Sequence, residues 1–279
     1  MNSTIPVGET EVPRIGLGTL YITIERGFGA ARADAVALLE EAARLGVSFF
    51  DTADSYGSGS AEEALRQALH PYDGLIITTK GGFRHERLGT WVPDALPERL
   101  RSVLEGSLRR LGLDRIELYQ LHCPDRRVPY AESVGTLADL QTEGKIQHIG
   151  VSNVDLRQLE IARGEAEIVS VQNPYNVRHQ WDTDVLDYCT RNDIIFIPWM
   201  PLGDGGISWD DPMLRRLATK HGATPAQIAL AALLHRSPVI LPIPGTSSIE
   251  HLRENVTAGG LPLDAEDLAE LWPDRRGGL

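Results

Sequence analysis

The sequence has few cysteines, no long apolar run and a shortage of positive charge. Cys123 and Cys189 are too few for a disulfide scaffold in 279 residues, and they are not spaced like metal ligands. No stretch approaches the ~20 consecutive apolar residues that cross a bilayer. These shortages argue against a disulfide-rich secreted domain, a cysteine-bound metal centre and a membrane-spanning protein.

Acidic residues outnumber basic ones by 39 to 27, which gives a net charge of −12 at pH 7. A surface of this sign repels nucleic acid and anionic membranes, so we expect neither as a partner. The net charge does not exclude a local basic pocket for a phosphorylated cofactor. Residues 1–16 lack the charged start, apolar core and cleavage site of a secretory signal, so we expect a cytoplasmic protein.

Short β-branched segments alternate with longer amphipathic ones along the chain. A β-hairpin is expected over residues 5–15, with its turn at Gly8-Glu9-Thr10. The predicted strands after it are 15–19, 47–51, 75–80, 116–122, 146–152, 168–173, 194–199 and 239–243. The predicted helices are 33–45, 60–69, 97–111, 130–143, 155–164, 183–192, 213–221, 225–235 and 248–258.

This alternation indicates an α/β protein with a parallel sheet and helical crossovers. Eight strand–helix units in residues 1–279 favour a single domain, a (β/α)8 TIM barrel with an N-terminal β-hairpin, over a doubly wound sheet. The pair Gly16 and Gly18 suggests a Rossmann turn, but no third glycine opens a helix directly after it. We therefore expect the closed barrel.

Polar or aromatic residues end most of the predicted strands, and in a barrel these ends meet at one mouth where chemistry collects. The terminal residues are Asp51, Lys80, His122, Ser152-Asn153, Gln172-Asn173 and Trp199. Each alone fits a solvated strand end or a backbone cap. Tyr56 follows Asp51 by one short loop, and that loop alone also fits a plain helix cap formed by Asp54 or Ser60. Six such ends together indicate an active site.

Several segments resemble the aldo-keto reductases, in that family's order, from the hairpin to about Asn255. They are FDTADSYG, TTKGG, YQLHCPD, GKIQHIGVSN, VQNPYN, PWMPLG and IPGTSSIEHLREN. The resemblance implies a (β/α)8 barrel that binds NADPH in extended form and reduces an aldehyde or ketone without a metal. The Gly-Thr-Ser-Ser segment is similar to a bacterial subgroup that includes pyridoxal reductases.

The family's catalytic tetrad falls on Asp51, Tyr56, Lys80 and His122. Hydride transfer to a carbonyl carbon makes an alkoxide, which must be protonated and stabilised as it forms. The resemblance implies that Tyr56 is the general acid, although a phenol with a pKa of about 10 is a weak acid at pH 7. A Lys80 ammonium beside it is expected to lower that pKa, with Asp51 holding the lysine charged. His122 is expected to orient the carbonyl.

The resemblance also implies the cofactor-binding residues, with Asp51 at the reactive end. They are Gly18 and Thr19 at the ribose; Ser152, Asn153 and Gln172 at the carboxamide; Trp199 on the nicotinamide ring; Leu202 and Gly203 along the pyrophosphate; Gly245, Thr246, Ser247 and His251 near the 2′-phosphate; and Glu254 and Asn255 at the adenine. Gly245 stands where many members have Lys, and His251 where many have Arg. These departures weaken the preference for NADPH and leave NADH open.

The substrate is the least defined part of the expectation. Tyr21, Phe28 and Trp91 are candidate contacts, with Cys123 as a fourth, although burial against neighbouring loops explains each equally well. The partner is expected to be a small-molecule carbonyl compound, either pyridoxal or a keto sugar or secondary-metabolite ketone, bound to a monomer or small homo-oligomer. A non-catalytic NADPH-sensing or interaction subunit on the same fold is the alternative from another class.

Overall fold

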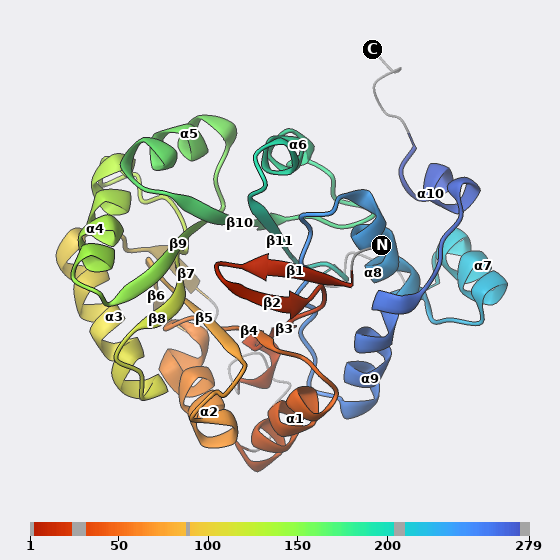
Figure 1. Ribbon diagram of the computed structural model, residues 1–279, viewed down its shortest axis with the longest axis horizontal. Helices are drawn as coiled ribbons and strands as arrows, with labels where there is room; N and C mark the ends of the chain where they lie inside the picture. The colour runs from red at the N-terminus through yellow and green to blue at the C-terminus, as the bar shows by residue number, and fades with distance from the viewer. Residues whose placement is uncertain (1–2, 24–31, 88–89, 204–209, 274–279) are drawn as a thin grey trace.

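A seven-stranded parallel sheet, curled on itself, forms the centre of the molecule (Figure 1). The computed structural model describes residues 3–23, 32–87, 90–203 and 210–273. The strand order is β11-β10-β9-β8-β5-β4-β3. The strands are β3 (Leu17–Gly18), β4 (Phe49–Asp51), β5 (Ile76–Gly81), β8 (Ile116–Leu121), β9 (Ile146–Ser152), β10 (Ile168–Pro174) and β11 (Ile195–Trp199).

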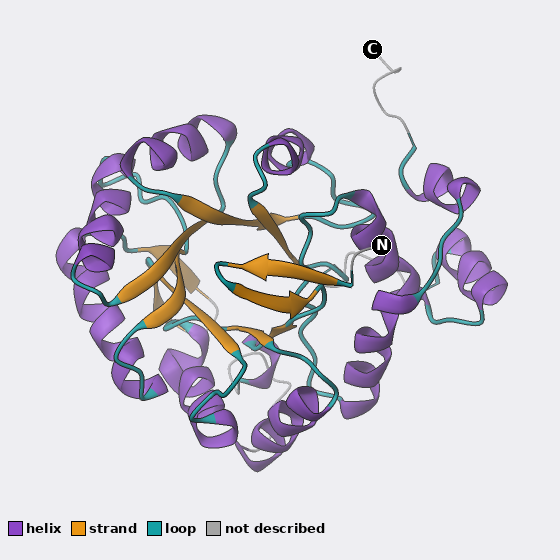
Figure 2. Cartoon of the chain, in the orientation of Figure 1, coloured by secondary structure: helices purple, strands orange, loops and turns teal. Residues whose placement is uncertain are grey.

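Helices surround the sheet on its outer face (Figure 2). They are α1 (Arg32–Arg44), α2 (Ser60–Leu69), α3 (Pro97–Leu111), α4 (Tyr130–Thr142), α5 (Leu156–Glu165), α6 (Thr183–Arg191), α7 (Pro212–His221), α8 (Pro225–Arg236) and α9 (Ile249–Thr257), with 3-10 turns η1 (Leu20–Ile22), η3 (Tyr56–Gly59) and η4 (Ala258–Gly260). In α3, Leu100, Leu104 and Leu111 recur at helical spacing and are fully buried. Thr224 caps α8 in a capping box with Gln227.

The wall of the barrel closes through residues 239–243, where the sequence predicts an eighth strand. That prediction is wrong in detail, since this segment makes only one isolated bridge, between Phe196 and Ile240. Pro242 and Pro244 have no N–H to give to a ladder. The segment still joins both edges of the sheet, because Leu241 N donates to Phe196 O at 2.9 Å and Gly16 N donates to Pro242 O at 3.0 Å.

Two elements were not expected from the sequence. The loop after β5 folds into an antiparallel hairpin of β6 (Phe83–Arg87) and β7 (Thr90–Pro93), which lies against the functional end of the barrel. Both strands are short, and β6 is mostly charged, so neither carries a clear alternation of apolar residues. The last helix, α10 (Ala265–Leu271), spans seven residues and begins with a capping box formed by Asp264 and Asp267.

The N-terminal hairpin, β1 (Thr4–Val7) and β2 (Thr10–Pro13), lies across the barrel axis (Figure 1). Its buried residues Ile5, Val7 and Val12 belong to one apolar cluster with residues near the starts of the barrel strands. Each such side chain contributes about 1.5–3 kcal/mol on burial. The hairpin therefore closes the amino-terminal end, and the carboxyl ends of the strands form the accessible one. Within the described residues, no helix is long and apolar enough to cross a membrane.

Candidate active site

A cavity of about 940 Å³ lies at the carboxyl ends of the barrel strands. Tyr56 and His122 line it, and so do Glu254 and Asn255 of α9. The cavity therefore runs from the strand ends that the sequence singled out to the helix that it associated with adenosine. Its size and continuity suit an extended ligand.

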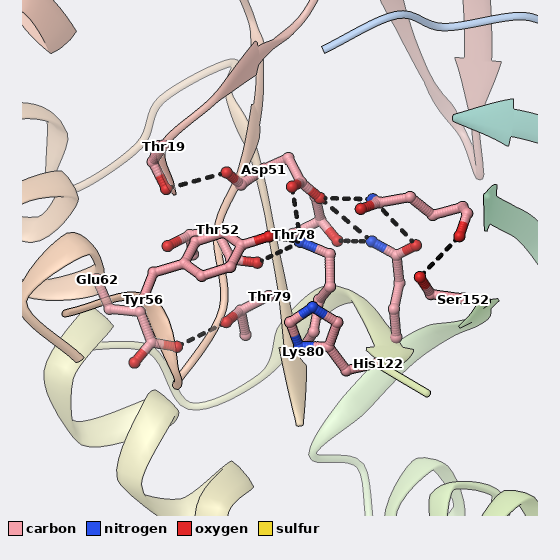
Figure 3. Close-up of polar contacts among 12 residues, drawn as sticks. Thr19, Asp51, Thr52, Tyr56, Glu62, Thr78, Thr79, Lys80, His122 and Ser152 are labelled. Atoms are coloured by element: carbon pink, nitrogen blue, oxygen red, sulfur yellow. Dashed lines mark hydrogen bonds and ion pairs between the residues drawn. The ribbon is translucent and has the colours of Figure 1, made fainter. Parts of the chain in front are cut away.

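Lys80 and Asp51 form a buried ion pair (Figure 3), and Asp51 lines the cavity. Lys80 Nζ donates to Asp51 Oδ2 at 2.6 Å, to Thr52 O at 2.8 Å and to the Tyr56 hydroxyl at 3.3 Å. The two charged side chains are 0% and 1% exposed. The three hydrogen bonds use all three donors of the ammonium and fix its position.

The charge of Lys80 is stabilised by its surroundings. Burial alone disfavours an ammonium, but the Asp51 carboxylate and the Tyr56 hydroxyl outweigh it, so the pKa of Lys80 is raised above its ordinary value. Lys80 is thus a permanent cation in contact with a phenol. Lys80 does not line the cavity itself, but its hydrogen-bond partners Asp51 and Tyr56 both do.

Two buried amides hold the other oxygen of Asp51. Gln172 Nε2 donates to Oδ1 at 2.9 Å, and Gln120 Nε2 approaches the same oxygen at 3.4 Å. The sequence pointed to Gln172 as a strand end but missed Gln120. Only the place of Gln120 two residues before His122 on the same strand could have suggested it.

His122 lies among aromatic rings at the cavity wall. Its ring centroid is 4.7 Å from Phe83, 5.9 Å from Tyr56 and 6.1 Å from Trp91, all edge to face. Burial, together with the charge of Lys80, lowers the pKa of His122 well below its usual value. The imidazole is therefore neutral at pH 7 and carries one N–H. Its Nδ1 is buried and has no hydrogen-bond partner among the described residues.

A polar chain links the ends of three further strands. Trp199 Nε1 donates to Asn153 Oδ1 at 3.1 Å, and Asn153 Nδ2 donates to Ser152 Oγ at 3.0 Å. Ser152 Oγ donates in turn to the backbone oxygen of Gln172 at 2.7 Å. All four residues line the cavity. The structure thus brings together the residues that were expected at a carboxamide.

The opposite part of the cavity is built around the start of α9. Leu202, Gly203, Gly245, Thr246, Ser247 and His251 line it, as does Gly18. Ser248 caps the helix, and Thr246 Oγ1 accepts from Ser248 N at 3.0 Å. Thr19 is the exception among the expected cofactor residues: its side chain is buried, its hydroxyl donates to Asp51 O at 3.0 Å, and it does not line the cavity.

Not all of the candidate substrate contacts can be placed at the cavity. Tyr21, Trp91 and Cys123 line the cavity, whereas Phe28 lies outside the described residues. Burial raises the pKa of the Cys123 thiol to about 12, which disfavours the thiolate that a nucleophilic role requires. Cavity-lining residues missed by the sequence include Phe83, which belongs to the unexpected β6–β7 hairpin.

Asp54 belongs to the loop that carries Tyr56 but does not line the cavity. Its carboxyl is buried, and its Oδ1 has no hydrogen-bond partner among the described residues. Burial, with the Glu62 carboxylate nearby, raises the pKa of Asp54 to about 7. Glu62 itself accepts hydrogen bonds from Thr79 and Arg110, each at 2.6 Å. In the described ranges, no group of three or more His, Cys, Asp or Glu could hold a metal.

A curled parallel sheet, a ring of helices and a cavity at the carboxyl ends of the strands define a barrel enzyme. A model of the Aldo/keto reductase family matches residues 14–272, and the chain belongs to this family of oxidoreductases. The resemblance seen in the sequence and the predicted barrel fold are thereby confirmed.

Similar proteins agree with this assignment. Pyridoxine 4-dehydrogenase of Escherichia coli is 41% identical over 280 residues, with 97% of each chain covered. An uncharacterized oxidoreductase of Schizosaccharomyces pombe is 40% identical, over 96% of this chain and 88% of that one. The crystal structure of an aldo/keto reductase from Klebsiella pneumoniae in complex with NADP and acetate has a TM-score of 0.84 at 30% identity, over 97% of this chain and 94% of that one.

Proposed function

We propose that the protein reduces an aldehyde or ketone to an alcohol with NADPH, and that Tyr56 is the general acid. The observation that supports this most is the buried Lys80 ammonium, which donates to both Asp51 and the Tyr56 hydroxyl. A cation against a phenol favours the phenolate that remains after the proton has left. Tyr56 and His122 both line the cavity, so a carbonyl oxygen can lie between them.

The cavity fits an extended phosphorylated dinucleotide. Thr246 and Ser247 offer hydroxyl groups beside the start of α9, where backbone N–H groups favour an anion. Gly18 lets two wall segments approach closely, because a Cβ there would lie 2.8 Å from Ile243 O. NADP in the similar Klebsiella pneumoniae structure supports this cofactor, while Gly245 and His251 keep NADH as the alternative.

Each side chain at the reactive end of the cavity has one role in the proposed reaction. When bound, the reduced nicotinamide supplies the hydride to the carbonyl carbon. Tyr56 gives its proton to the carbonyl oxygen, and the ammonium of Lys80 stabilises the phenolate left behind. Neutral His122 donates its one N–H to the same oxygen and orients it. In alcohol oxidation the Tyr56 phenolate takes the proton back.

Pyridoxal is the candidate substrate that we favour over a keto sugar or a secondary-metabolite ketone. The support is the aromatic wall, where Trp91 meets Tyr56 at 6.0 Å and Phe83 at 5.7 Å between ring centroids. Such rings suit a flat aromatic aldehyde. The name of the Escherichia coli relative, pyridoxine 4-dehydrogenase, points the same way.

Replacing Tyr56 by phenylalanine tests the proposal. We expect reduction to fall by about 10²–10⁴-fold, the usual contribution of a general acid, because only the proton donor is lost. The Kd for NADPH should stay within about twofold. The assay compares turnover of pyridoxal, simple aldehydes and keto sugars.

Tyr130→Phe is the matched control, since the Tyr130 hydroxyl is buried outside the cavity and has no hydrogen-bond partner among the described residues. It should keep full activity. Retained activity in Tyr56→Phe would reject Tyr56 as the acid. A wild-type protein that binds NADPH tightly but turns over no carbonyl would support the sensing subunit instead.

A further inference from the structure

Gln120 touches the Asp51 carboxylate without lining the cavity. Its side chain lies on β8 inside the barrel and is fully buried. Its Nε2 donates to Thr78 Oγ1 at 3.1 Å and approaches Asp51 Oδ1 at 3.4 Å. Its Oε1 lies 3.5 Å from Gln172 Nε2. Gln120 thus meets the buried ion pair from beneath, away from any bound molecule.

The orientation of this amide is set by its neighbours. An ionised carboxylate only accepts hydrogen bonds, so the NH₂ group of Gln120 must face Asp51 and its oxygen must face Gln172. In the sheet, Gln120 is paired with Lys80 on one side and with Gly150 on the other. A Cβ at Gly150 would lie 2.9 Å from Gln120 Cγ, so the glycine leaves the space that this side chain fills.

We propose that Gln120 is a positioning residue for Asp51. Its amide holds Oδ1 so that Oδ2 stays directed at Lys80, which keeps the ammonium against the Tyr56 hydroxyl. The inference rests on the proposed role of Tyr56 as general acid. The titratable groups around this unit are Asp51 from β4, Lys80 from β5, Tyr56 from η3 and His122 after β8.

Gln172 holds the same oxygen at 2.9 Å but also lines the cavity. A change at Gln172 would therefore disturb ligand binding and carboxylate position together. Gln120 does not line the cavity and reaches it only through Asp51 and, by the longer 3.5 Å contact, through Gln172. A change at Gln120 therefore disturbs the position of the carboxylate with less direct effect on ligand binding than a change at Gln172.

Gln120→Met removes the amide while keeping the length of the side chain. We expect kcat for carbonyl reduction to fall about tenfold, the lower end for loss of a hydrogen bond to a charged group. KM for the carbonyl and Kd for NADPH should not change. The acidic limb of the pH profile for alcohol oxidation should move to higher pH, because the phenolate of Tyr56 is less well stabilised.

Gln120→Glu supplies a second, independent readout. The introduced carboxyl would face Asp51 and share a proton with it, since two adjacent carboxylates do not both ionise readily. Activity should therefore be near that of the wild type at low pH and fall as the second proton is lost. If the ratio of activity between this variant and the wild type did not change with pH, the inference would be overturned.

A double-mutant cycle with Asp51→Asn gives the decisive comparison. Without the carboxylate charge, Gln120→Met should cost less than twofold. The same tenfold loss in both backgrounds, or a wild-type kcat and pH profile in Gln120→Met, would overturn the inference.

Gln141→Met is the control for loss of a glutamine hydrogen bond away from the site. Gln141 Nε2 donates to Gln147 O at 2.7 Å, and this variant should leave the pH profile unchanged. A wild-type protein without turnover would instead refute the proposed function itself, so the two failures are distinguishable.

Discussion

Lys80→Met tests how much the buried ion pair contributes to the free energy of unfolding and to the rate of carbonyl reduction. The change removes the ammonium but leaves the Asp51 carboxylate 1% exposed, with only the amides of Gln172 and Gln120 as donors. Breaking a buried pair in this way costs about 3–5 kcal/mol. The free energy of unfolding should therefore fall by about 4 kcal/mol at pH 7.

The assay is urea unfolding at pH 7 and pH 5, beside the rate of carbonyl reduction. The raised pKa of Lys80 means that the stability from its charge is fully present below the unfolded lysine value of about 10.4 and lost only at higher pH. The wild-type ammonium is therefore constant across this range. The deficit of the variant should therefore come from the uncompensated Asp51 carboxylate and not from a change in the wild type.

The double variant Asp51→Asn/Lys80→Met removes both charges. Its stability at pH 7 should return to within about 1 kcal/mol of the wild type, because no uncompensated charge is buried. Its activity should not return, since the ammonium beside Tyr56 is still missing. Wild-type stability in Lys80→Met, or restored activity in the double variant, would refute this reasoning.

Two further changes test other parts of the site. His251→Arg should lower the Kd for NADPH about fivefold, because an exposed ion pair with the 2′-phosphate contributes roughly 1 kcal/mol. The Kd for NADH should not change. Equal effects on both cofactors would mean that the 2′-phosphate lies elsewhere. Gly245→Lys is the poorer variant, because a Cβ at Gly245 would lie 2.5 Å from the Tyr21 ring. The pKa of Asp54 is raised from 3.8 to about 7, so the wild type loses stability as the pH rises through that range. Asp54→Asn does not titrate there and should become more stable relative to the wild type. The gain reaches at most about 4 kcal/mol by pH 8 in urea unfolding, and an equal difference at pH 5 and pH 8 would contradict it.

The barrel and the strand ends could be predicted from the sequence because each segment carries a local signal. Alternation of strand and helix sets the order of the sheet, and the parallel direction brings Asp51, Lys80 and His122 to one end. The convergence of these three strand ends follows from periodicity and topology. Tyr56 follows on the next loop, but its place beside Lys80 was implied by the family resemblance.

The remaining features depend on contacts that no local pattern reports. Residues 118–121 of β8 are buried on both faces, so alternation does not show that Gln120 points inward. The β6–β7 hairpin owes its place to aromatic contacts between Trp91 and the cavity wall. Thr19 was expected to face the cavity, but its backbone and hydroxyl both bond to Asp51 O.

The proline-containing segment at residues 239–243 makes one side of the barrel wall unlike the rest. Neighbouring strands such as β8 and β9 are joined along their full length, whereas this segment is held to β11 through Phe196 and to the chain before β3 through Gly16. Few backbone hydrogen bonds must break for the wall to separate here. Residues 243–248 line the cavity at and directly after this segment. The cavity wall beside the start of α9 is thus continuous with a seam that a small number of backbone hydrogen bonds holds closed.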